Sequence, residues 1–338
     1  MEALLYERLK GNKVRCDLCS HRCVISDGDR GRCGVRENRS GTLESLVYGR
    51  LIARHIDPIE KKPIFHLAPG SRSYSIATVG CNFTCRFCQN ADIAQMPADH
   101  NGRIVGEPVL PAVIVEEAAE TGCRSIAYTY TEPTVYFEYA LDTARLARAR
   151  GLKNVFVTNG YMSAEAIEMA APFLDAANVD LKAFRDDFYR EYCGARLEPV
   201  KATLVDMKKR GILVEITTLL IPGLNDDPRE LAALADFIVT SLGPETPWHI
   251  SRFHPTYRLT DRPATPLAGI LEARDIGLAA GLAHVYCGNT PGEKGESTFC
   301  GACGGLLIER YGYTIRQNRI AAGRCPACQS SIHGVELS

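Results

Sequence analysis

The chain has 338 residues, 46% of them hydrophobic, and a formal net charge of −1 at pH 7. This length suits about two domains, and the near-neutral charge argues against a broad electrostatic surface for nucleic acid or anionic membrane. No apolar run reaches the roughly 18 residues of a membrane span, and the polar start "MEALLYERLKGNK" lacks the apolar core of a signal peptide. We therefore expect a cytoplasmic protein.

The fourteen cysteines are distributed like metal ligands rather than like disulfide partners. Eleven of them fall into three tight groups, and disulfides are rare in a reducing compartment. The other three, Cys123, Cys193 and Cys287, stand alone in the sequence. Lone free cysteines are usually small buried hydrophobic residues, and we expect that of these three.

Residues 1–72 are predicted to form a small cysteine-rich metal-binding segment and a linker. The four cysteines of "CDLCSHRC" and "GRCG" have the spacing C-x2-C-x3-C-x9-C; they are Cys16, Cys19, Cys23 and Cys33. This set indicates a metal, but zinc and an auxiliary iron–sulfur cluster are hard to separate by spacing, so the metal is left open. The stretch "IDPIEKKPIFHLAPGSR" is rich in turn residues, and we expect little regular structure in this segment.

Residues 73–290 alternate short β-rich runs with amphipathic helical stretches, which is typical of βαβ units and a parallel sheet. Several helical stretches end in glycine, as a helix C-terminus prefers. About six repeats predict an α/β fold with an open or partial barrel, in which ligands bind just after the strands. The predicted strands are 73–79, 125–130, 154–158, 177–182, 213–220, 247–253 and 284–287.

The loop "GCNFTCRFCQN" follows the first of these strands and contains Cys81, Cys85 and Cys88. A [4Fe-4S] cluster needs four ligands, so three thiolates leave one iron free for another molecule. A three-thiol zinc site completed by histidine or water is the weaker alternative, because nearby His66 and His100 lack ligand spacing.

Residues 291–338 form the third predicted segment, with a C-x2-C pair on each side of a β-hairpin. Two such pairs supply four thiolates in the closed tetrahedral arrangement of a structural zinc site, which makes the segment zinc-ribbon-like. Four unrelated thiols, or a redox role for one pair, are weaker alternatives. The four cysteines are Cys300, Cys303, Cys325 and Cys328.

The C-x3-C-x2-C loop, its strand and the following repeats resemble the radical S-adenosylmethionine (SAM) superfamily. The resemblance implies a partial (β/α)6 barrel and a [4Fe-4S] cluster that binds SAM at the fourth iron. It also implies reductive cleavage of SAM to methionine and a 5'-deoxyadenosyl radical, which abstracts hydrogen from a substrate. The electron donor would be a flavodoxin or ferredoxin. Phe87 stands where this family usually has an aromatic residue.

Further residues resemble the SAM-binding positions of glycyl-radical-enzyme activating proteins, such as the pyruvate formate-lyase activating enzyme. In "YTYTEPT", Glu132 matches the glutamate of a Gly-Gly-Glu-Pro motif that holds the SAM ammonium, although Tyr130 and Thr131 replace both glycines. A solvated glutamate that caps the next helix is the alternative. The stretch "VTNGY" with Thr158 and Asn159 is similar to one that lines the SAM pocket.

Three more residues complete the predicted cofactor site. Asp180 and Lys182 lie in a "DLK" stretch like that of the activating enzymes, but two residues apart on a strand they could equally form a salt bridge. His249 follows the start of the sixth strand and could contact SAM or substrate. A buried, hydrogen-bonded histidine is the commoner situation.

Taken together, the N-terminal quartet, "DPIEKKPIFHLAPG", the three-cysteine loop and the C-terminal pairs resemble AmmeMemoRadiSam-system radical SAM enzymes over nearly the whole chain. The resemblance implies association with Memo-like and AMMECR-like proteins, whereas it gives no substrate. Activating enzymes usually carry extra cluster cysteines after the SAM motif, so the N-terminal quartet departs from them. A radical SAM enzyme, acting on a protein or another substrate, is the leading hypothesis. A non-catalytic zinc-ribbon module that binds a macromolecule is the alternative.

Overall fold

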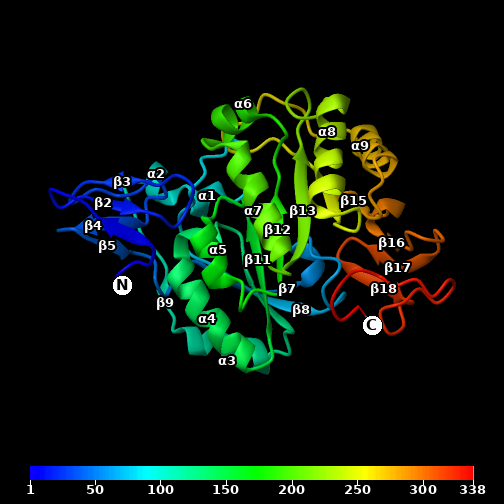
Figure 1. Cartoon of the computed structure of the whole chain (residues 1–338), viewed down its shortest axis with the longest axis horizontal. Helices are drawn as coiled ribbons and strands as arrows, with labels where there is room; N and C mark the ends of the chain where they lie inside the picture. The colour runs from blue at the N-terminus through cyan, green and yellow to red at the C-terminus, as the bar shows by residue number, and fades with distance from the viewer. Residues whose placement is uncertain (338) are drawn as a thin grey trace.

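The computed structural model describes residues 1–337, and an eight-stranded sheet forms its centre (Figure 1). The strand order is β15-β14-β13-β12-β11-β10-β8-β7, and every neighbouring pair from β8 to β15 is parallel. All seven predicted strands are present as β8 (Arg72–Ala77), β10 (Ser125–Tyr128), β11 (Lys153–Thr158), β12 (Ala176–Asp180), β13 (Leu213–Leu220), β14 (Trp248–Arg252) and β15 (Val285–Gly288). The parallel α/β fold is thus confirmed.

Helices connect the parallel strands and cover the sheet (Figure 1). Two of them start at a capping side chain. The Ser163 hydroxyl accepts a hydrogen bond from the Ala166 N–H, and the Asp227 carboxylate, which precedes Pro228, accepts one from the Arg229 N–H. The long helices alternate with the strands, as the sequence predicts: α3 (Pro111–Glu120), α4 (Phe137–Ala149), α5 (Ala164–Ala170), α7 (Leu197–Lys209), α8 (Pro228–Phe237) and α9 (Leu267–Ala279).

Shorter helical turns occupy the connections. They are η1 (Ile59–Lys61), α1 (Ala91–Ala94), α2 (Met96–Asp99), η2 (Pro133–Tyr136), α6 (Asp186–Phe188), η3 (Tyr189–Cys193), η4 (Ile238–Leu242) and η5 (Lys294–Glu296). Two of them, η3 and η4, are π-helical.

The N-terminal segment contains regular structure, so the expectation of little regular structure was wrong. Short strands pair there because their polar and apolar residues alternate, as the buried and partly exposed residues of β2 and β5 do. The strands are β1 (Tyr6–Arg8), β2 (Val14–Cys16), β3 (Val24–Ile25), β4 (Arg36–Arg39), β5 (Thr42–Ser45) and β6 (Arg50–Leu51), which pairs with β9 (Glu107–Pro108).

The predicted linker also contributes to the main sheet. Strand β7 (Ala53–Pro58) pairs antiparallel with β8 and forms the sheet edge. Beyond it, the backbone N–H groups of Phe65 and His66 donate to the buried Glu215 carboxylate in the middle of β13, at 2.9 and 2.8 Å. The division at residue 72 stays a proposal about folding units, since this connector packs into the barrel.

The C-terminal segment forms a separate three-stranded sheet at the end of the molecule opposite the N-terminal strands (Figure 1). Its strands are β16 (Thr298–Phe299), β17 (Leu306–Tyr311) and β18 (Thr314–Asn318), which confirm the predicted hairpin. A small core beneath it includes Cys300, Leu307 and Ile332.

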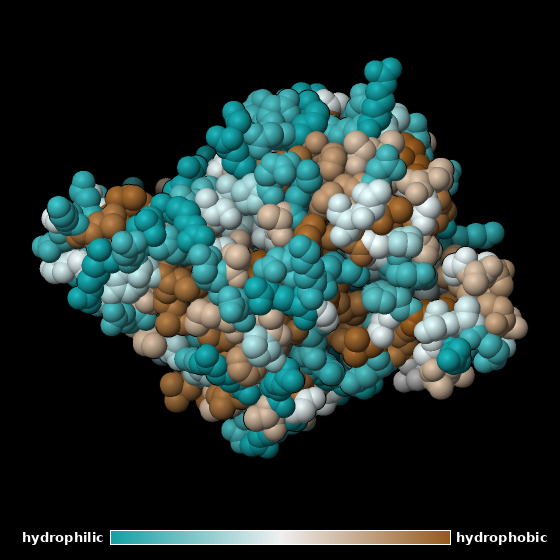
Figure 2. Space-filling model, in the orientation of Figure 1, coloured by the Kyte–Doolittle hydropathy of each residue, from teal (hydrophilic) through white to brown (hydrophobic). Residues whose placement is uncertain are grey.

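The surface is mainly hydrophilic over the face shown in Figure 2, with small separate apolar areas. Within residues 1–337, no helix has both the length and the apolar character needed to cross a membrane.

Candidate cofactor site and metal centres

The three-cysteine loop begins three residues after β8, where a parallel sheet presents its ligand-binding edge. Gly80 has φ +100, and a Cβ there would lie 2.5 Å from Val35 Cγ1 and 3.1 Å from the Cys33 carbonyl oxygen. Only glycine therefore lets the N-terminal segment pack directly against the loop. Within the loop, the Phe83 N–H donates to Cys81 Sγ at 3.4 Å.

Glu132 is buried and lies between the ends of β10 and β11. Its Oε1 accepts from the Thr134 N–H and from the hydroxyls of Thr134 and Thr158, at 3.1, 2.5 and 2.7 Å. Burial raises the pKa of Glu132, although these hydrogen bonds favour the charged form. The carboxylate caps η2, as expected if Glu132 were a helix cap, but it is buried rather than solvated.

Thr158 and Asn159 connect Glu132 to the three-cysteine loop. The Asn159 N–H donates to Glu132 Oε2 at 2.8 Å, and its side-chain amide donates to Asn82 Oδ1 at 2.7 Å. The same amide lies 3.8 Å from Cys81 Sγ. The structure thus brings together the predicted residues of three successive strand ends. Asn82 was missed from the sequence because an asparagine inside a cysteine motif has no pattern of its own.

Tyr130, which replaces a glycine of the motif, keeps a backbone conformation that favours glycine, with φ +62. Its carbonyl accepts from the Asn90 side chain at 2.8 Å, and its hydroxyl donates to Asp57. Lys62 Nζ donates to the same carboxylate at 2.5 Å and lies 4.5 Å from the Tyr130 ring centroid. These contacts from the connector hold the unusual backbone in place.

Asp180 and Lys182 form the salt bridge considered from the sequence, with Nζ donating to Oδ2 at 2.8 Å. Burial lowers the pKa of Lys182, but the negative charge beside it, above all the Asp180 carboxylate, outweighs burial and holds that pKa above its usual value. Lys182 Nζ also lies 5.9 Å from the centroid of the buried Phe87 ring. The pair therefore lies beside the three-cysteine loop, whatever else it binds.

Cys123, Cys193 and Cys287 are buried, as expected for lone cysteines. Cys193 ends the π-helical turn η3, which is hydrogen-bonded to the three-cysteine loop through its backbone. The Cys193 carbonyl accepts from the Thr84 N–H at 2.9 Å, so η3 supports the loop. Sequence reasoning missed this contact, because about a hundred residues separate Thr84 from Cys193.

His249 is buried and hydrogen-bonded, which was the alternative to a contact with SAM or substrate. Its Nε2 lies 2.6 Å from Glu215 Oε2, and its ring stacks on Tyr286 with centroids 5.0 Å apart. Phe65 of the connector packs edge-on against it, at 4.7 Å between ring centroids. Within the described chain, none of these contacts reaches the three-cysteine loop. A role for His249 at SAM stays a prediction.

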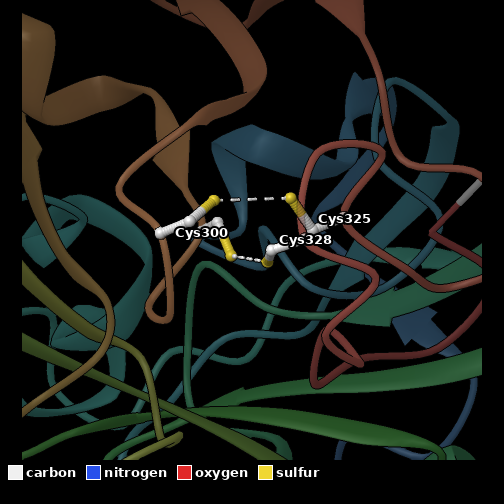
Figure 3. A group of neighbouring side chains, drawn as sticks. Cys300, Cys325 and Cys328 are labelled. Carbon is white, nitrogen blue, oxygen red and sulfur yellow. Dashed lines mark hydrogen bonds between the residues drawn. The ribbon is translucent and has the colours of Figure 1, made fainter.

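The C-terminal cysteines converge on one point. The sulfur atoms of Cys300, Cys303, Cys325 and Cys328 all lie within 4.8 Å of one another. Two pairs, Cys300 with Cys328 and Cys303 with Cys325, are separated by 3.6 and 3.7 Å. Figure 3 shows the sulfurs of two chain segments facing each other. Tetrahedral zinc with Zn–S bonds of about 2.3 Å needs sulfurs about 3.8 Å apart, so these side chains fit that ion.

The loop cysteines are spaced differently. Of the described residues, only the C-terminal four form a group within 4.8 Å, so Cys81, Cys85 and Cys88 do not converge on a single small ion. An iron–sulfur cluster fits this spacing, because irons and sulfides lie between the thiolates. Burial raises the pKa of Cys88 to about 11, so the thiol stays protonated until a cation binds.

Comparison with known proteins agrees with this arrangement. A family model of the radical SAM superfamily matches residues 75–235. The isethionate sulfite-lyase activating enzyme of Nitratidesulfovibrio vulgaris is 31% identical over 237 residues, which cover 67% of this chain and 72% of that enzyme. The chain belongs to the radical SAM superfamily and is an enzyme of that class, which implies a [4Fe-4S] cluster, SAM and a reductant.

Two further relatives are similar to the chain. An uncharacterized protein of Methanocaldococcus jannaschii is 46% identical over 333 residues, covering 98% of each chain. The pyruvate formate-lyase-activating enzyme of Streptococcus mutans is 24% identical over 180 residues, covering 51% of this chain and 67% of that enzyme. Within its superfamily, the protein is thus similar to activating enzymes.

Proposed function

We propose that this enzyme uses SAM to abstract hydrogen from a protein substrate, in the manner of an activating enzyme. The observation that carries the proposal is the position of the three-cysteine loop: Cys81 lies at the strand-end edge together with Asn159 and, through it, Glu132. A protein substrate is supported by the similarity to two activating enzymes, whose names specify an enzyme as the target.

Cys81, Cys85 and Cys88 would hold the [4Fe-4S] cluster, which when bound supplies the electron that cleaves SAM to methionine and a 5'-deoxyadenosyl radical. The residues around it bind and orient. Asn159 fixes Asn82 and Cys81, so the loop keeps its shape while the cofactor enters.

The charged residues at this edge match the groups of SAM. Glu132 offers negative charge to the ammonium, since its Oε2 accepts only one hydrogen bond from the described chain. Lys182 offers positive charge to the carboxylate, and Asp180 keeps it oriented. Phe87 and Phe188, 5.8 Å apart between centroids, exclude water beside the loop.

We propose zinc as the ion of the four C-terminal cysteines, with a structural role. The distances between sulfurs support zinc, and the site offers no open position once four thiolates bind. Memo-like and AMMECR-like proteins are the first partners to test as substrates, because of the family resemblance.

The first experiment measures SAM cleavage by the reduced, anaerobically reconstituted enzyme. We expect 5'-deoxyadenosine and methionine from the wild type, and none from Cys81→Ala, Cys85→Ala or Cys88→Ala. Cys123→Ala is a matched control, because this cysteine is also buried but lies away from the loop. Product from all three loop variants would contradict the cluster assignment, whereas no product from the reconstituted wild type would favour the non-catalytic zinc-ribbon alternative.

A second experiment tests the substrate class. Extract from cells grown in deuterated medium is separated into protein and small-molecule fractions, and each is incubated with reduced enzyme and SAM. Deuterium in 5'-deoxyadenosine from the protein fraction alone would support a protein substrate. Deuterium from the small-molecule fraction alone would overturn it.

A further inference from the structure

The four N-terminal cysteines surround one pocket beside the proposed SAM site. Cys16 ends β2, Cys19 and Cys23 follow in the turn to β3, and Cys33 precedes β4. All four line a single pocket together with apolar side chains of the segment, such as Leu18 and Ile25. The pocket therefore collects four potential thiolates from a short stretch of chain.

The sulfur positions distinguish this quartet from the C-terminal one. In the described residues, no three sulfurs of the N-terminal quartet lie within 4.8 Å of one another, whereas all four C-terminal sulfurs do. The hydrogen bonds of the described chain include two close thiol pairs in the C-terminal set and none in the N-terminal set. A single zinc ion, or a [2Fe-2S] cluster whose irons each take two thiolates, needs close pairs.

A glycine packs against the pocket between two of the sulfurs. A Cβ at Gly31 would lie 3.9 Å from both Cys23 Sγ and Cys33 Sγ and 3.3 Å from Ile25 Cδ1. Its backbone does not have the positive φ that favours glycine, so close packing against Ile25 and the two thiols accounts for the missing side chain. A methyl group here would therefore crowd any group that the thiols bind.

A buried cation faces the same pocket. Arg36 is 1% exposed, lines the pocket, and donates from Nη1 to Cys16 Sγ at 3.5 Å. Its Nη2 pairs with the buried Glu138, while its Nε has no hydrogen-bond partner in the part of the chain that the structure describes. A buried, incompletely satisfied guanidinium beside four cysteines suits an anionic thiolate-bound cluster.

We propose that Cys16, Cys19, Cys23 and Cys33 bind an auxiliary [4Fe-4S] cluster. Four cysteines occupy every iron, so this cluster has no open position and does not bind SAM. The chain would then carry three centres: an auxiliary cluster, the SAM-binding cluster and the C-terminal zinc. The proposal goes beyond the proposed function, and it holds for any substrate.

The auxiliary cluster lies next to the three-cysteine loop. Asn82 lines the pocket, and its carbonyl oxygen accepts a hydrogen bond from His21 Nε2 at 2.8 Å. Gly80 packs on the Cys33 carbonyl, and Figure 1 shows strands β2 and β3 beside α1 and α2, which follow the loop. The two centres thus share one wall, made by residues adjacent to Cys81.

The test uses the full chain, purified and reconstituted without oxygen, and counts iron, sulfide and zinc. We expect about eight irons per wild-type chain and about four in the triple variant Cys81→Ala/Cys85→Ala/Cys88→Ala. The electron paramagnetic resonance spectrum of the four remaining irons, after reduction, should not change when SAM is added. Two zinc ions and no iron in the triple variant would overturn the proposal.

A complementary variant removes the auxiliary ligands instead. Cys19→Ala/Cys23→Ala should fall from about eight irons to about four, which still respond to SAM. If this variant keeps all the irons of the wild type, or if the wild type holds only about four, the quartet does not bind a [4Fe-4S] cluster. SAM cleavage is not used as the readout, so failure here leaves the proposed function standing.

Adding one methyl group at Gly31 tests the position of the cluster within the pocket. Gly31→Ala is introduced into the triple variant, whose remaining iron is bound by the N-terminal quartet. It should lower that iron at least twofold, because its Cβ lies between Cys23 and Cys33. The matched control is Gly269→Ala on α9, where a Cβ meets nothing closer than 3.9 Å. Full iron content in Gly31→Ala would contradict the position of the cluster within the pocket.

Discussion

Among single residues, Glu132 combines a structural role with a proposed binding role. Its carboxylate connects strand ends and is proposed to bind the SAM ammonium. The hydroxyls of Thr134 and Thr158 and the N–H of Asn159 would lose their acceptor in Glu132→Ala. We expect a loss of about 3 kcal/mol in the free energy of unfolding and a SAM dissociation constant at least tenfold higher. Chemical denaturation and equilibrium binding measure the two effects.

Glu132→Gln separates these roles. It keeps a carbonyl acceptor for the hydroxyls of Thr134 and Thr158, removes the charge and loses the hydrogen bond from the Asn159 N–H. Part of the stability should therefore remain, while SAM affinity still falls. An unchanged dissociation constant in this variant would leave Glu132 a cap of η2 alone.

Asp57 gives a pH-dependent prediction at the same scale. Burial raises the pKa of its carboxyl, but hydrogen bonds from Lys61, Lys62 and Tyr130 outweigh burial and hold that pKa below its usual value. The stabilising contribution is therefore fully present above the unfolded pKa of about 3.9 and is lost as pH falls through the folded value.

We expect Asp57→Asn to lower the free energy of unfolding by about 2 kcal/mol at pH 7. The difference from the wild type should shrink below about pH 4. Denaturant titrations at several pH values measure this. A difference that stays constant into acid would show that the carboxylate charge contributes nothing.

At the scale of elements, Glu215 joins the connector to the barrel. Its carboxylate, at the centre of β13, accepts from the N–H groups of Phe65 and His66 and lies 2.6 Å from His249. Removing it leaves two buried N–H donors unpaired, which is among the costliest changes a core can suffer.

Glu215→Ala should lower the free energy of unfolding by about 3 kcal/mol. His249→Gln, which removes only one of the three contacts, should cost about 1 kcal/mol. Denaturation of both variants checks this order. If the SAM dissociation constant rose in His249→Gln while stability did not change, His249 would belong to the cofactor site after all.

For the whole molecule, the zinc proposed at the C-terminal cysteines would stabilise the fold and take no part in the chemistry. Structural metal binding contributes directly to folding, and these four thiols lie on a sheet with its own small core. Cys303→Ser should lose one zinc per chain and lower the midpoint of thermal unfolding, while the folded fraction still cleaves SAM. Metal analysis, calorimetry and product assay measure the three effects. Loss of iron but not zinc would make the tail an auxiliary cluster domain.

Strand and helix positions follow from the sequence, because burial on both faces of a parallel sheet requires continuous apolar runs. The order of segments likewise places Cys81, Thr158 and Asp180 at the carboxyl ends of parallel strands, at one edge of the sheet. The C-terminal pairs predict a four-thiolate site from local spacing alone, since each pair lies in one short turn.

Other features depend on contacts that local patterns do not contain. Strand β7 joins the sheet through pairing, although its sequence reads as a turn-rich connector. Glu215 lies 150 positions from the N–H of Phe65, so nothing near either residue indicates their bond. Tyr130 adopts a left-handed backbone because distant Asp57 and Lys62 hold its side chain.

The cysteine clusters show most clearly which features depend on sequence and which on tertiary structure. Spacing alone predicted that the N-terminal quartet and the C-terminal pairs are ligand sets, and it left the choice between zinc and an iron–sulfur cluster open for the quartet. Only the tertiary structure decided how far apart the sulfurs lie and that Gly31 and Arg36 face the pocket between them. The reason is physical: metal identity depends on distances between ligand atoms in space, and these are set by packing of the whole segment.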